Sequence, residues 1–295
     1  MARLAVLAGV LCLLLLGACG TGGTPATHVT WWRPSDTGPD YGPEFQWELD
    51  HPLNTRSVSD RTSQPTVYDI DGIENSASTV AALHKHQDKV ICYIEVGAAG
   101  NYYSASTEHV PVSYYTRLSR DHDLGRAVPG YPEYYLDIAK SSTVSIIKAM
   151  IRQQCAAKHF DAVEPDIDDS YTDSTGFGIT ERQNTAYDRT LAAYAHSLGL
   201  AWGQKNGDND AAFSKALEPV TDFLLIEECV YYDTCAIATP PYIKAGKLVL
   251  DAEYTSDWGS DLLSDLRRLC PVDAALHLDS TLFAPALAGQ RDPCH

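Results

Sequence analysis

The sequence predicts an α/β protein folded as a single (β/α)8 TIM barrel. Eight short apolar segments alternate with helical or loop segments, a pattern typical of parallel strands joined by crossover connections. Most of these segments end in acidic or amide side chains, as expected where barrel strands meet at their carboxyl ends. No glycine-rich phosphate loop follows any of them, which disfavours an open doubly wound sheet. The predicted strands cover 45–49, 65–71, 89–97, 134–138, a segment that begins at 160, 200–206, 221–229 and 247–254.

Three of the intervening segments are predicted to be helices: 75–88, a stretch from Ser141 or Ser142 to about 158, and 180–197. Apolar residues recur at helical spacing in the first two, and serine is a favoured N-cap for the second. The third starts with a threonine that is followed three residues later by a glutamine, and a glycine comes just after its end. These are the signals of a capping box and of a helix C-terminus.

Two segments do not fit the alternation. The long polar section 101–130 is rich in tyrosine and has little periodicity, so we expect it to form a lid or a binding wall. The strand-like segment 274–280 is left over once eight strands are assigned. We expect it to cover the edge or the bottom of the barrel.

The N-terminus predicts export. Residues 1–18 combine one arginine, an apolar run and small residues, and the run is short for a membrane-spanning helix. The last four residues up to Cys19 match a bacterial lipobox, so we expect Cys19 to be lipidated on the outer face of the cell membrane, with plain secretion as the alternative. Residues 19–28 would form a flexible tether, and 29–295 one folded domain.

The charge of the chain limits its partners. The formal net charge is −17, which argues against binding to nucleic acid or to an anionic membrane surface. Contact with a membrane is therefore expected only through the lipid. A neutral or cationic substrate suits this charge, and we expect the domain to act as a monomer.

Six cysteines remain beyond the signal and the lipidation candidate, and an even number in an exported chain favours disulfides. A local pair of Cys229 with Cys235 is expected, and Cys270 with Cys294 would fix the C-terminal tail. The other two candidates are Cys92 and Cys155. Metal binding is disfavoured, because there is no CxxC motif and the histidines form no ligand cluster.

The most informative stretch is FDAVEPDIDDSY, residues 160–171, where an apolar strand runs into four carboxylates. Because side chains alternate along a strand, Glu164, Asp166 and Asp168 are expected on one face, where like charges raise at least one pKa. A pair of carboxylates with separated pKa values is what glycoside hydrolysis requires. A solvated acidic loop or a helix N-terminus is the alternative interpretation of this stretch.

In a barrel, the polar strand ends would surround one mouth. Acids interleaved with aromatic and amide side chains are typical of sites that bind sugar hydroxyls and stack on sugar rings. A structural ion-pair network is the alternative for this ring, and core packing is the alternative for its tyrosine. The candidate substrate-binding residues are Asp69, Asp71, Glu95, Glu164, Lys205, Asn206, Glu253 and Tyr254.

The motifs VYDIDG, KVICYIEVG, FDAVEPDIDDSY, GQKN, IEEC and GKLVLDAEY occur in an order that resembles the glycoside hydrolase family 114 domain. The resemblance covers essentially the whole mature chain. It implies a TIM-barrel endo-α-1,4-polygalactosaminidase with an Asp and a Glu as catalytic pair. No cofactor is expected, because two carboxylates and a water suffice for the reaction. The motifs place this pair at Asp166 and Glu227. Glu95 stands where the family has a smaller residue, which leaves the exact polysaccharide open.

Two other functions are compatible with the same sequence. One is a carbohydrate-binding lipoprotein on the same barrel that has lost catalysis. The other is a barrel hydrolase for a different polysaccharide, or a deacetylase, which would need histidine ligands for a metal. The barrel alone does not choose among them, because one fold hosts many functions.

Overall fold

The computed structural model describes residues 29–35, 45–55, 66–207, 210–259 and 261–294. The predicted signal 1–18, Cys19 and the tether 19–28 lie outside the described residues and stay predictions. None of the helices in the described part of the chain has the length and the hydropathy of a membrane span.

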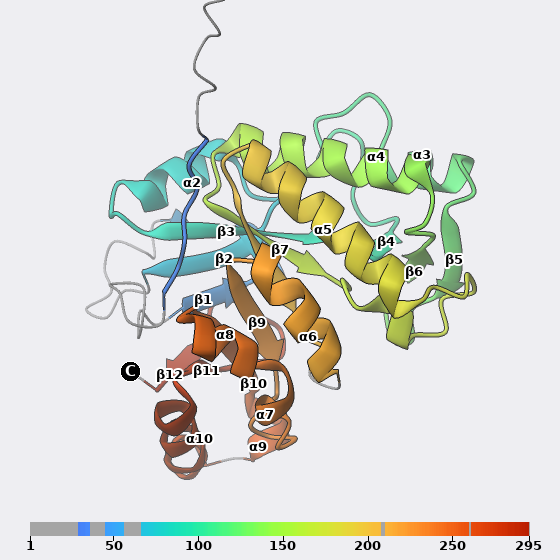
Figure 1. The fold of residues 1–295 in the computed structure, drawn as a ribbon. Helices are drawn as coiled ribbons and strands as arrows, with labels where there is room; N and C mark the ends of the chain where they lie inside the picture. Colours follow the sequence, from blue (N-terminus) through green and yellow to red (C-terminus); the bar gives the residue numbers. More distant parts are fainter. Residues whose placement is uncertain (1–28, 36–44, 56–65, 208–209, 260, 295) are drawn as a thin grey trace, which may run out of the picture.

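A nine-stranded sheet forms the centre of the molecule and curls into a nearly closed barrel, which confirms the predicted fold class (Figure 1). Eight strands are parallel to their neighbours, and a ninth pairs antiparallel with the last of them. In sheet order they are β1 (Phe45–Glu48), β2 (Val67–Asp71), β3 (Lys89–Glu95), β7 (Ala162–Asp166), β8 (Ala201–Lys205), β9 (Phe223–Glu227), β10 (Val249–Tyr254), β11 (Asp279–Phe283) and β12 (Arg291–Pro293).

The two ends of the parallel sheet meet through aromatic packing. Phe45 of β1 lies edge-to-face against Phe283 of β11, with ring centroids 5.2 Å apart. Trp47 packs against the same phenylalanine at 6.1 Å. All three side chains are buried. These contacts bring the first and the last parallel strand together, so the carboxyl ends of all eight strands face one mouth.

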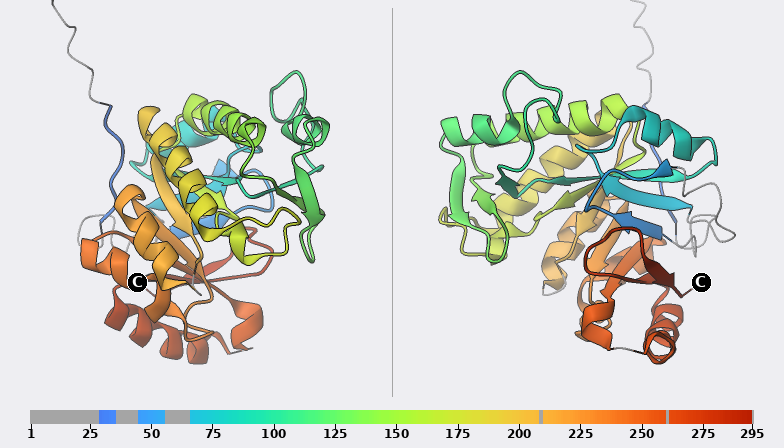
Figure 2. Two further views of the ribbon diagram at one scale, coloured as in Figure 1. Left: turned by 45° about the vertical axis from the view of Figure 1, so that its right-hand side comes forward. Right: turned by 180° about the vertical axis from the view of Figure 1, so that it is seen from behind.

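Helices cover the outside of the barrel, with α4 and α5 crossing the face formed by the first strands (Figure 2). The α5 helix begins with the predicted capping box between Thr180 and Gln183, and Ser76 caps α2. Neither predicted serine caps α4, because Lys140 occupies its N-cap. The helices are α2 (Ala77–His84), α3 (Tyr114–Arg120), α4 (Ser141–Met150), α5 (Glu181–Ser197), α6 (Ala211–Leu217), α7 (Cys235–Ala238), α8 (Pro240–Ala245), α9 (Thr255–Trp258) and α10 (Leu262–Leu276).

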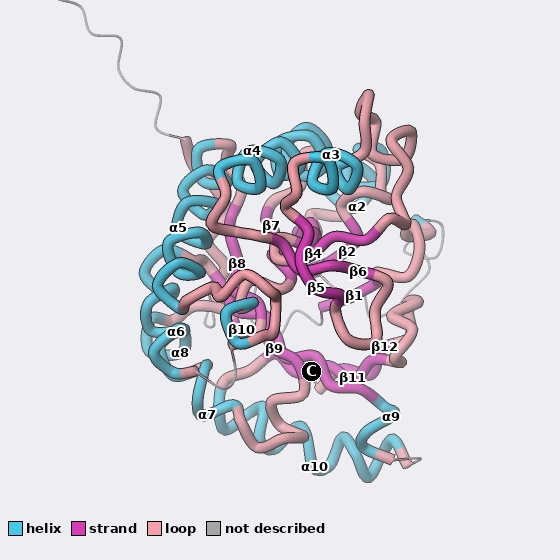
Figure 3. The backbone as a smooth tube through the Cα atoms, turned by 90° about the vertical axis from the view of Figure 1, so that its right-hand side faces the viewer, coloured by secondary structure: helices cyan, strands magenta, loops and turns pink. Residues whose placement is uncertain are grey.

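The assignment of 134–138 as a barrel strand is wrong. That segment forms β6 (Glu133–Leu136), which pairs antiparallel with β4 (Ala98–Gly100) and β5 (Leu124–Ala127) in a separate small sheet (Figure 3). The eighth barrel strand is β11, which overlaps the segment left unplaced. The apolar run at 134–136 made β6 resemble a barrel strand. In contrast, β11 begins with three buried polar residues, which are atypical of a parallel strand buried on both faces.

The section 101–130 is not a structureless loop. It contains α3, which Ser113 caps, and β5 of the small sheet. Short elements with mixed burial give too few repeats for a periodic signal in the sequence. The section nevertheless adjoins the barrel mouth, as a binding wall would.

Three disulfides join the six predicted cysteines. Cys229–Cys235 and Cys270–Cys294 form as expected, and Cys92 of β3 pairs with Cys155, just beyond α4. The Cys92–Cys155 bond joins a barrel strand to a helix that covers the barrel, and its cysteines are 63 residues apart. The cysteines of the Cys229–Cys235 bond are only six residues apart. The loop-closure entropy that a disulfide removes from the unfolded chain grows with loop length.

We therefore expect the double variant Cys92→Ala/Cys155→Ala to lose about 4 kcal/mol of unfolding free energy. The matched variant Cys229→Ala/Cys235→Ala is expected to lose about 2 kcal/mol. Denaturant unfolding of the two variants beside the wild type measures both losses. An equal or reversed order would show that packing around the sulfurs, and not loop length, decides the stabilisation.

Candidate active site

The barrel mouth holds a cleft of about 400 Å³. Its floor comes from the ends of β1, β3, β7, β8, β9 and β10, and its rim includes residues of the small β4–β6–β5 sheet. Trp47, Tyr93, Asp166, Lys205, Asn206, Glu227 and Tyr254 line the floor. Glu133, Tyr135, Asp169 and Asp173 line one side.

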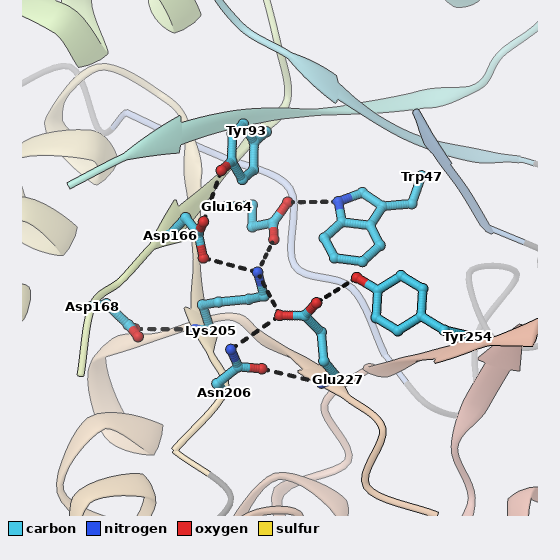
Figure 4. A network of polar contacts seen from close by, with 9 residues as sticks. All are labelled: Trp47, Tyr93, Glu164, Asp166, Asp168, Lys205, Asn206, Glu227 and Tyr254. Atoms are coloured by element: carbon cyan, nitrogen blue, oxygen red, sulfur yellow. Dashed lines mark hydrogen bonds and ion pairs between the residues drawn. The ribbon is translucent and has the colours of Figure 1, made fainter. Parts of the chain in front are cut away.

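Lys205 lies at the centre of this floor (Figure 4). Its Nζ is 2.9 Å from Asp166 Oδ1, 3.0 Å from Glu164 Oε1 and 3.2 Å from Glu227 Oε2. The ammonium also lies over the Trp47 ring, 5.0 Å from its centroid. Only 2% of the Lys205 side chain is exposed, so its charge is directed almost wholly at these carboxylates.

Asp166 ends β7 and accepts two hydrogen bonds, from Tyr93 Oη at 2.7 Å and from Lys205 Nζ at 2.9 Å. Burial by itself would raise the pKa of Asp166, but the Lys205 ammonium and these hydrogen bonds outweigh it and hold that pKa below its ordinary value. About 20% of the side chain is exposed to the cleft. Asp166 is therefore an ionised carboxylate that a ligand can reach.

Glu227 ends β9 and is 25% exposed. Tyr254 Oη donates to its Oε1 at 2.5 Å, and Asn206 Nδ2 donates to its Oε2 at 3.1 Å. The Glu227 backbone N–H in turn donates to Asn206 Oδ1 at 3.1 Å, which fixes the amide orientation. Because one Lys205 nitrogen contacts both acids, Asp166 Oδ1 and Glu227 Oε2 are at most about 6 Å apart.

Glu164 and Asp69 lie beneath the cleft and do not line it. Both are fully buried. Trp47 Nε1 donates to Glu164 Oε2 at 3.1 Å, and the other Glu164 oxygen contacts Lys205. Burial, followed by the neighbouring charge of Glu164, raises the pKa of Asp69 well above its ordinary value. Neither residue is placed to bind a ligand directly.

Three other predicted binding residues also lie away from the cleft. Asp71 and Glu95 border a separate small cavity, where Tyr103 and Tyr102 donate hydrogen bonds to them. Glu253 is fully buried and accepts hydrogen bonds from Trp258 Nε1 at 2.6 Å and from the Val230 backbone N–H at 2.8 Å. The structure thus brings Asp166, Lys205, Asn206, Glu227 and Tyr254 together in the cleft.

The strands that carry the central residues end in strained turns. Ile167, Asn206 and Glu228 have φ values of 57°, 50° and 54°, and each is the first residue after its strand, β7, β8 and β9 respectively. Left-handed backbone is costly for a β-branched residue such as Ile167, and strain of this kind gathers at functional sites. The turn at Ile167 ends the strand alternation, so Asp168 points back and accepts the Lys205 backbone N–H at 3.0 Å.

Gly97 supports the turn at Ile167. A Cβ atom at position 97 would lie 1.9 Å from the Ile167 carbonyl oxygen, a distance that no side chain tolerates. The Val96 and Gly97 backbone N–H groups also donate to the Asp166 carbonyl, at 3.0 and 3.3 Å. Close backbone approach at Gly97 therefore fixes the end of β7.

We expect Gly97→Ala to displace Asp166 and to lower kcat by about 10²-fold, the usual effect of a misplacement of about 1 Å. It should also lower the melting temperature. The control is Gly130→Ala, whose φ of 84° also strains an alanine, so its melting temperature should fall too. The added Cβ meets nothing within 4 Å, however, and kcat should stay unchanged. If both variants keep wild-type kcat, the contact between Gly97 and Ile167 has no part in positioning Asp166.

The sequence did not lead us to predict the acidic side of the cleft, which Glu133, Asp169 and Asp173 form. Burial, and then the charge of Asp166, raises the pKa of Glu133 to about 7. Burial, and then the charges of Asp173 and Asp166, raises the pKa of Asp169 to about 7. Asp169 was visible in the acidic stretch, whereas no sequence signal pointed to Glu133. Within the described ranges, no three His, Cys, Asp or Glu side chains are arranged to hold a metal ion.

Comparisons with known proteins agree with this geometry. The model of glycoside-hydrolase family GH114 matches residues 23–290. Among solved structures, Ega3 of Aspergillus fumigatus in complex with galactosamine superposes with a TM-score of 0.75 at 23% identity, covering 90% of this chain and 98% of Ega3. The glycoside hydrolase domain of PelA from Pseudomonas aeruginosa gives 0.58 at 14% identity, covering 84% and 97%. A search of curated proteins finds no match.

Proposed function

Because the chain belongs to glycoside hydrolase family GH114, we propose that it cleaves internal α-1,4 bonds of a galactosamine-containing polysaccharide with Asp166 and Glu227. The observation that carries the proposal is the pair of reachable carboxylates held on one buried ammonium. We also propose that the protein is exported and attached through Cys19. The three disulfides favour an oxidising location.

We assign Asp166 as the nucleophile, since Lys205 and Tyr93 hold it ionised. In the first step, an Asp166 oxygen bonds to the anomeric carbon while the glycosidic C–O bond breaks and Glu227 gives its proton to the leaving oxygen. In the second step, water attacks the same carbon and loses a proton to Glu227. The ester bond then breaks and Asp166 is released as a carboxylate.

The two oxygens that contact Lys205 are at most about 6 Å apart, which allows the separation of roughly 5–5.5 Å between carboxyl groups that is typical of this two-step route. Inverting glycosidases need room for a water between the carboxyl groups, with a separation of roughly 6.5–9.5 Å. The assignment of Asp166 as nucleophile predicts retention of the anomeric configuration. Proton NMR of the first-formed product measures it directly.

The acidic side of the cleft supports a cationic substrate. Lys205 is the one basic residue among those that line the cleft in the described structure, and three carboxylates already surround it. Within the described residues no Lys, Arg or His forms an ion pair with Glu133, Asp169 or Asp173. Burial raises the pKa of all three carboxyl groups, so the ammonium of a free galactosamine unit would stabilise their ionised forms and be bound by them. Ega3, which shares the fold, was solved with galactosamine.

The test is the size distribution of products from α-1,4-linked galactosamine polymers of graded N-acetylation, followed by mass spectrometry. We expect short oligomers, released faster as more amines are free. Glu133→Gln should raise KM for the deacetylated polymer by about 10-fold, and less for the acetylated one. Retention of the polymer without any product would instead identify a carbohydrate-binding lipoprotein without catalysis.

A further inference from the structure

We propose that Tyr231 and Tyr232 form a sugar-stacking platform outside the cleft, which binds galactosamine units of the polymer that lie beyond the reacting bond. The inference rests on the proposed function, because it takes the same polysaccharide as ligand. The loop 228–234, which carries both tyrosines, contributes no residue to the lining of the cleft. The platform is therefore a second binding site, next to the one that holds the reacting carboxylates.

The cleft has room for only a short piece of a polymer. Its volume of about 400 Å³ is near the lower end of the range of roughly 300–1,000 Å³ that is usual for small-molecule sites. An enzyme that cleaves internal bonds binds a chain that continues on both sides of the reacting bond. Sugar units outside the cleft must therefore lie on the surface that surrounds the mouth.

The platform consists of two exposed tyrosine rings in contact with each other. Tyr231 and Tyr232 are 40% and 60% exposed, and their rings meet edge to face with centroids 4.9 Å apart. A single exposed aromatic side chain is ordinary on a protein surface, whereas adjoining exposed rings form a contiguous patch of the kind that marks a binding site. Such ring faces are apolar surfaces on which a sugar ring can stack.

The loop that carries the two rings is held in place from three directions. The disulfide Cys229–Cys235 closes it. The buried Glu253 accepts a hydrogen bond from the Tyr231 backbone N–H at 3.3 Å, and the Tyr231 ring packs against the buried Trp258 with centroids 6.2 Å apart. A ligand therefore meets rings that are already ordered, which lowers the entropic cost of binding. Glu253, a predicted binding residue, supports the platform instead of contacting the sugar.

The platform is continuous with the mouth of the barrel. Its loop begins directly after Glu227, the last residue of β9, and the Tyr232 backbone N–H donates to the Glu228 carbonyl at 3.0 Å. Asp257 lies in α9, which directly follows β10. The charge of Glu228, with a smaller contribution from Asp257, raises the pKa of Tyr232, so both carboxylates lie near this ring.

These two carboxylates fit the ammonium group of a galactosamine unit. Within the described residues, no Lys, Arg or His forms an ion pair with Glu228 or Asp257. Burial, and then the charge of Asp257, raises the pKa of Glu228 to about 7. An ammonium group would stabilise the ionised form of Glu228 and be bound by it. The surface beside the rings thus carries the charge that a deacetylated polymer requires.

An exposed ring on another side of the cleft suits the same chain. Tyr131 is 67% exposed and lines the cleft from the segment between β5 and β6. This segment belongs to the excursion between β3 and β7, and β7 and β8 separate β3 from β9 in the sheet. A polymer that lies over the reacting carboxylates can therefore extend from Tyr131 at one side of the mouth to Tyr232 at another.

The test measures the affinity of α-1,4-linked galactosamine oligomers of increasing length by isothermal titration calorimetry. The full chain carries Asp166→Asn, so that the oligomers are not cleaved. We expect affinity to increase when the oligomers become long enough to leave the cleft. Adding Tyr232→Ala should remove this increase and lower the affinity of long oligomers by about 3- to 10-fold, while short oligomers bind as before.

The matched control is Tyr134→Ala in the same background. Tyr134 is 40% exposed, as Tyr231 is, but its neighbours Glu133 and Tyr135 line the cleft, and strand alternation places it on the opposite face. It should leave the affinity of all oligomers unchanged. An equal loss in Tyr134→Ala and Tyr232→Ala would contradict a platform at Tyr232.

A further variant separates stacking from charge. Glu228→Gln should lower the affinity of long oligomers with free amines by about 2- to 5-fold and leave fully N-acetylated oligomers unaffected. Tyr232→Ala should weaken both kinds, because stacking does not require the ammonium group. If Tyr232→Ala left every oligomer affinity unchanged but dissociated a dimer in analytical ultracentrifugation, the patch would be an interface between copies of the chain, and the proposal would be wrong.

Product release by the wild type is measured separately, so the two proposals can fail independently. If the wild type releases no product but the affinity of long oligomers depends on Tyr232, the proposed function fails and the platform stands. If product forms but Tyr232→Ala binds long oligomers as tightly as its parent, the platform fails alone.

Discussion

Asp166→Asn is expected to lower kcat by at least about 10³-fold, the usual cost of removing a nucleophile that no other group replaces. Asparagine keeps the shape of the side chain, but its single amide oxygen can replace only one of the two carboxylate oxygens that accept from Tyr93 and Lys205. It cannot form the ester with the anomeric carbon. Release of reducing ends from the deacetylated polymer measures the loss, with denaturant unfolding to verify that the variant is folded.

The matched control for this variant is Asp169→Asn, which removes a neighbouring cleft acid. We expect it to affect KM more than kcat. A second arm adds azide to Asp166→Ala, where the small anion fits the vacated space and attacks the anomeric carbon from the same side. A β-glycosyl azide would identify Asp166 as the nucleophile. Activity of Asp166→Asn within tenfold of the wild type would exclude that role.

Glu227→Gln is expected to lower kcat on the polymer by about 10²- to 10⁴-fold, the range for loss of a general acid or base. The leaving sugar hydroxyl needs a proton, whereas an activated aryl group leaves without one. The same variant should therefore lose much less in the first step on an aryl galactosaminide. Its second step still lacks a base, so glycosyl-enzyme should accumulate and appear as an added mass on the intact protein.

Pre-steady-state kinetics measures the rate of the first and of the second step separately, with the polymer and with the aryl galactosaminide. If Glu227→Gln lost the same factor with the polymer and with the aryl substrate, Glu227 would not be the proton donor. Asn206→Ala provides the control, because it removes the amide that orients Glu227 while the carboxyl group remains. Its loss should be smaller and should not depend on the leaving group.

The barrel was predictable because seven of its parallel strands are apolar in the sequence and end in polar groups. The eighth was not, since Asp279, Ser280 and Thr281 are buried in β11 and resemble a loop in sequence. Their burial depends on partners from other elements. Asp251 Oδ2, for example, accepts a hydrogen bond from Ser280 at 2.8 Å. Local propensity carries no information about such tertiary partners.

The sequence predicted those site residues whose position depends only on where a barrel strand ends. Asp166, Lys205 and Glu227 are the last residues of three successive strands of the sheet, so parallel pairing brings them together. How deeply each of these side chains is buried in the barrel was not predictable. Glu164 is only two residues before Asp166 and faces the same lysine, yet it is fully buried, because position along the strand sets depth in the barrel. The direction of Asp168 depended on the turn at Ile167.

All three strands of the small β4–β6–β5 sheet lie in the sequence between β3 and β7. The small sheet is therefore inserted into the barrel at one point only. It supplies Glu133 and Tyr135 to the cleft wall, while the reacting carboxylates come from the barrel. Part of the proposed contact with the polymer is thus encoded in a different stretch of sequence from the reacting carboxylates, whereas Asp169 and Asp173 come from the loop after β7. Evolution, or a designer, could exchange this excursion between related hydrolases and change which polymer is accepted while the reaction is inherited intact.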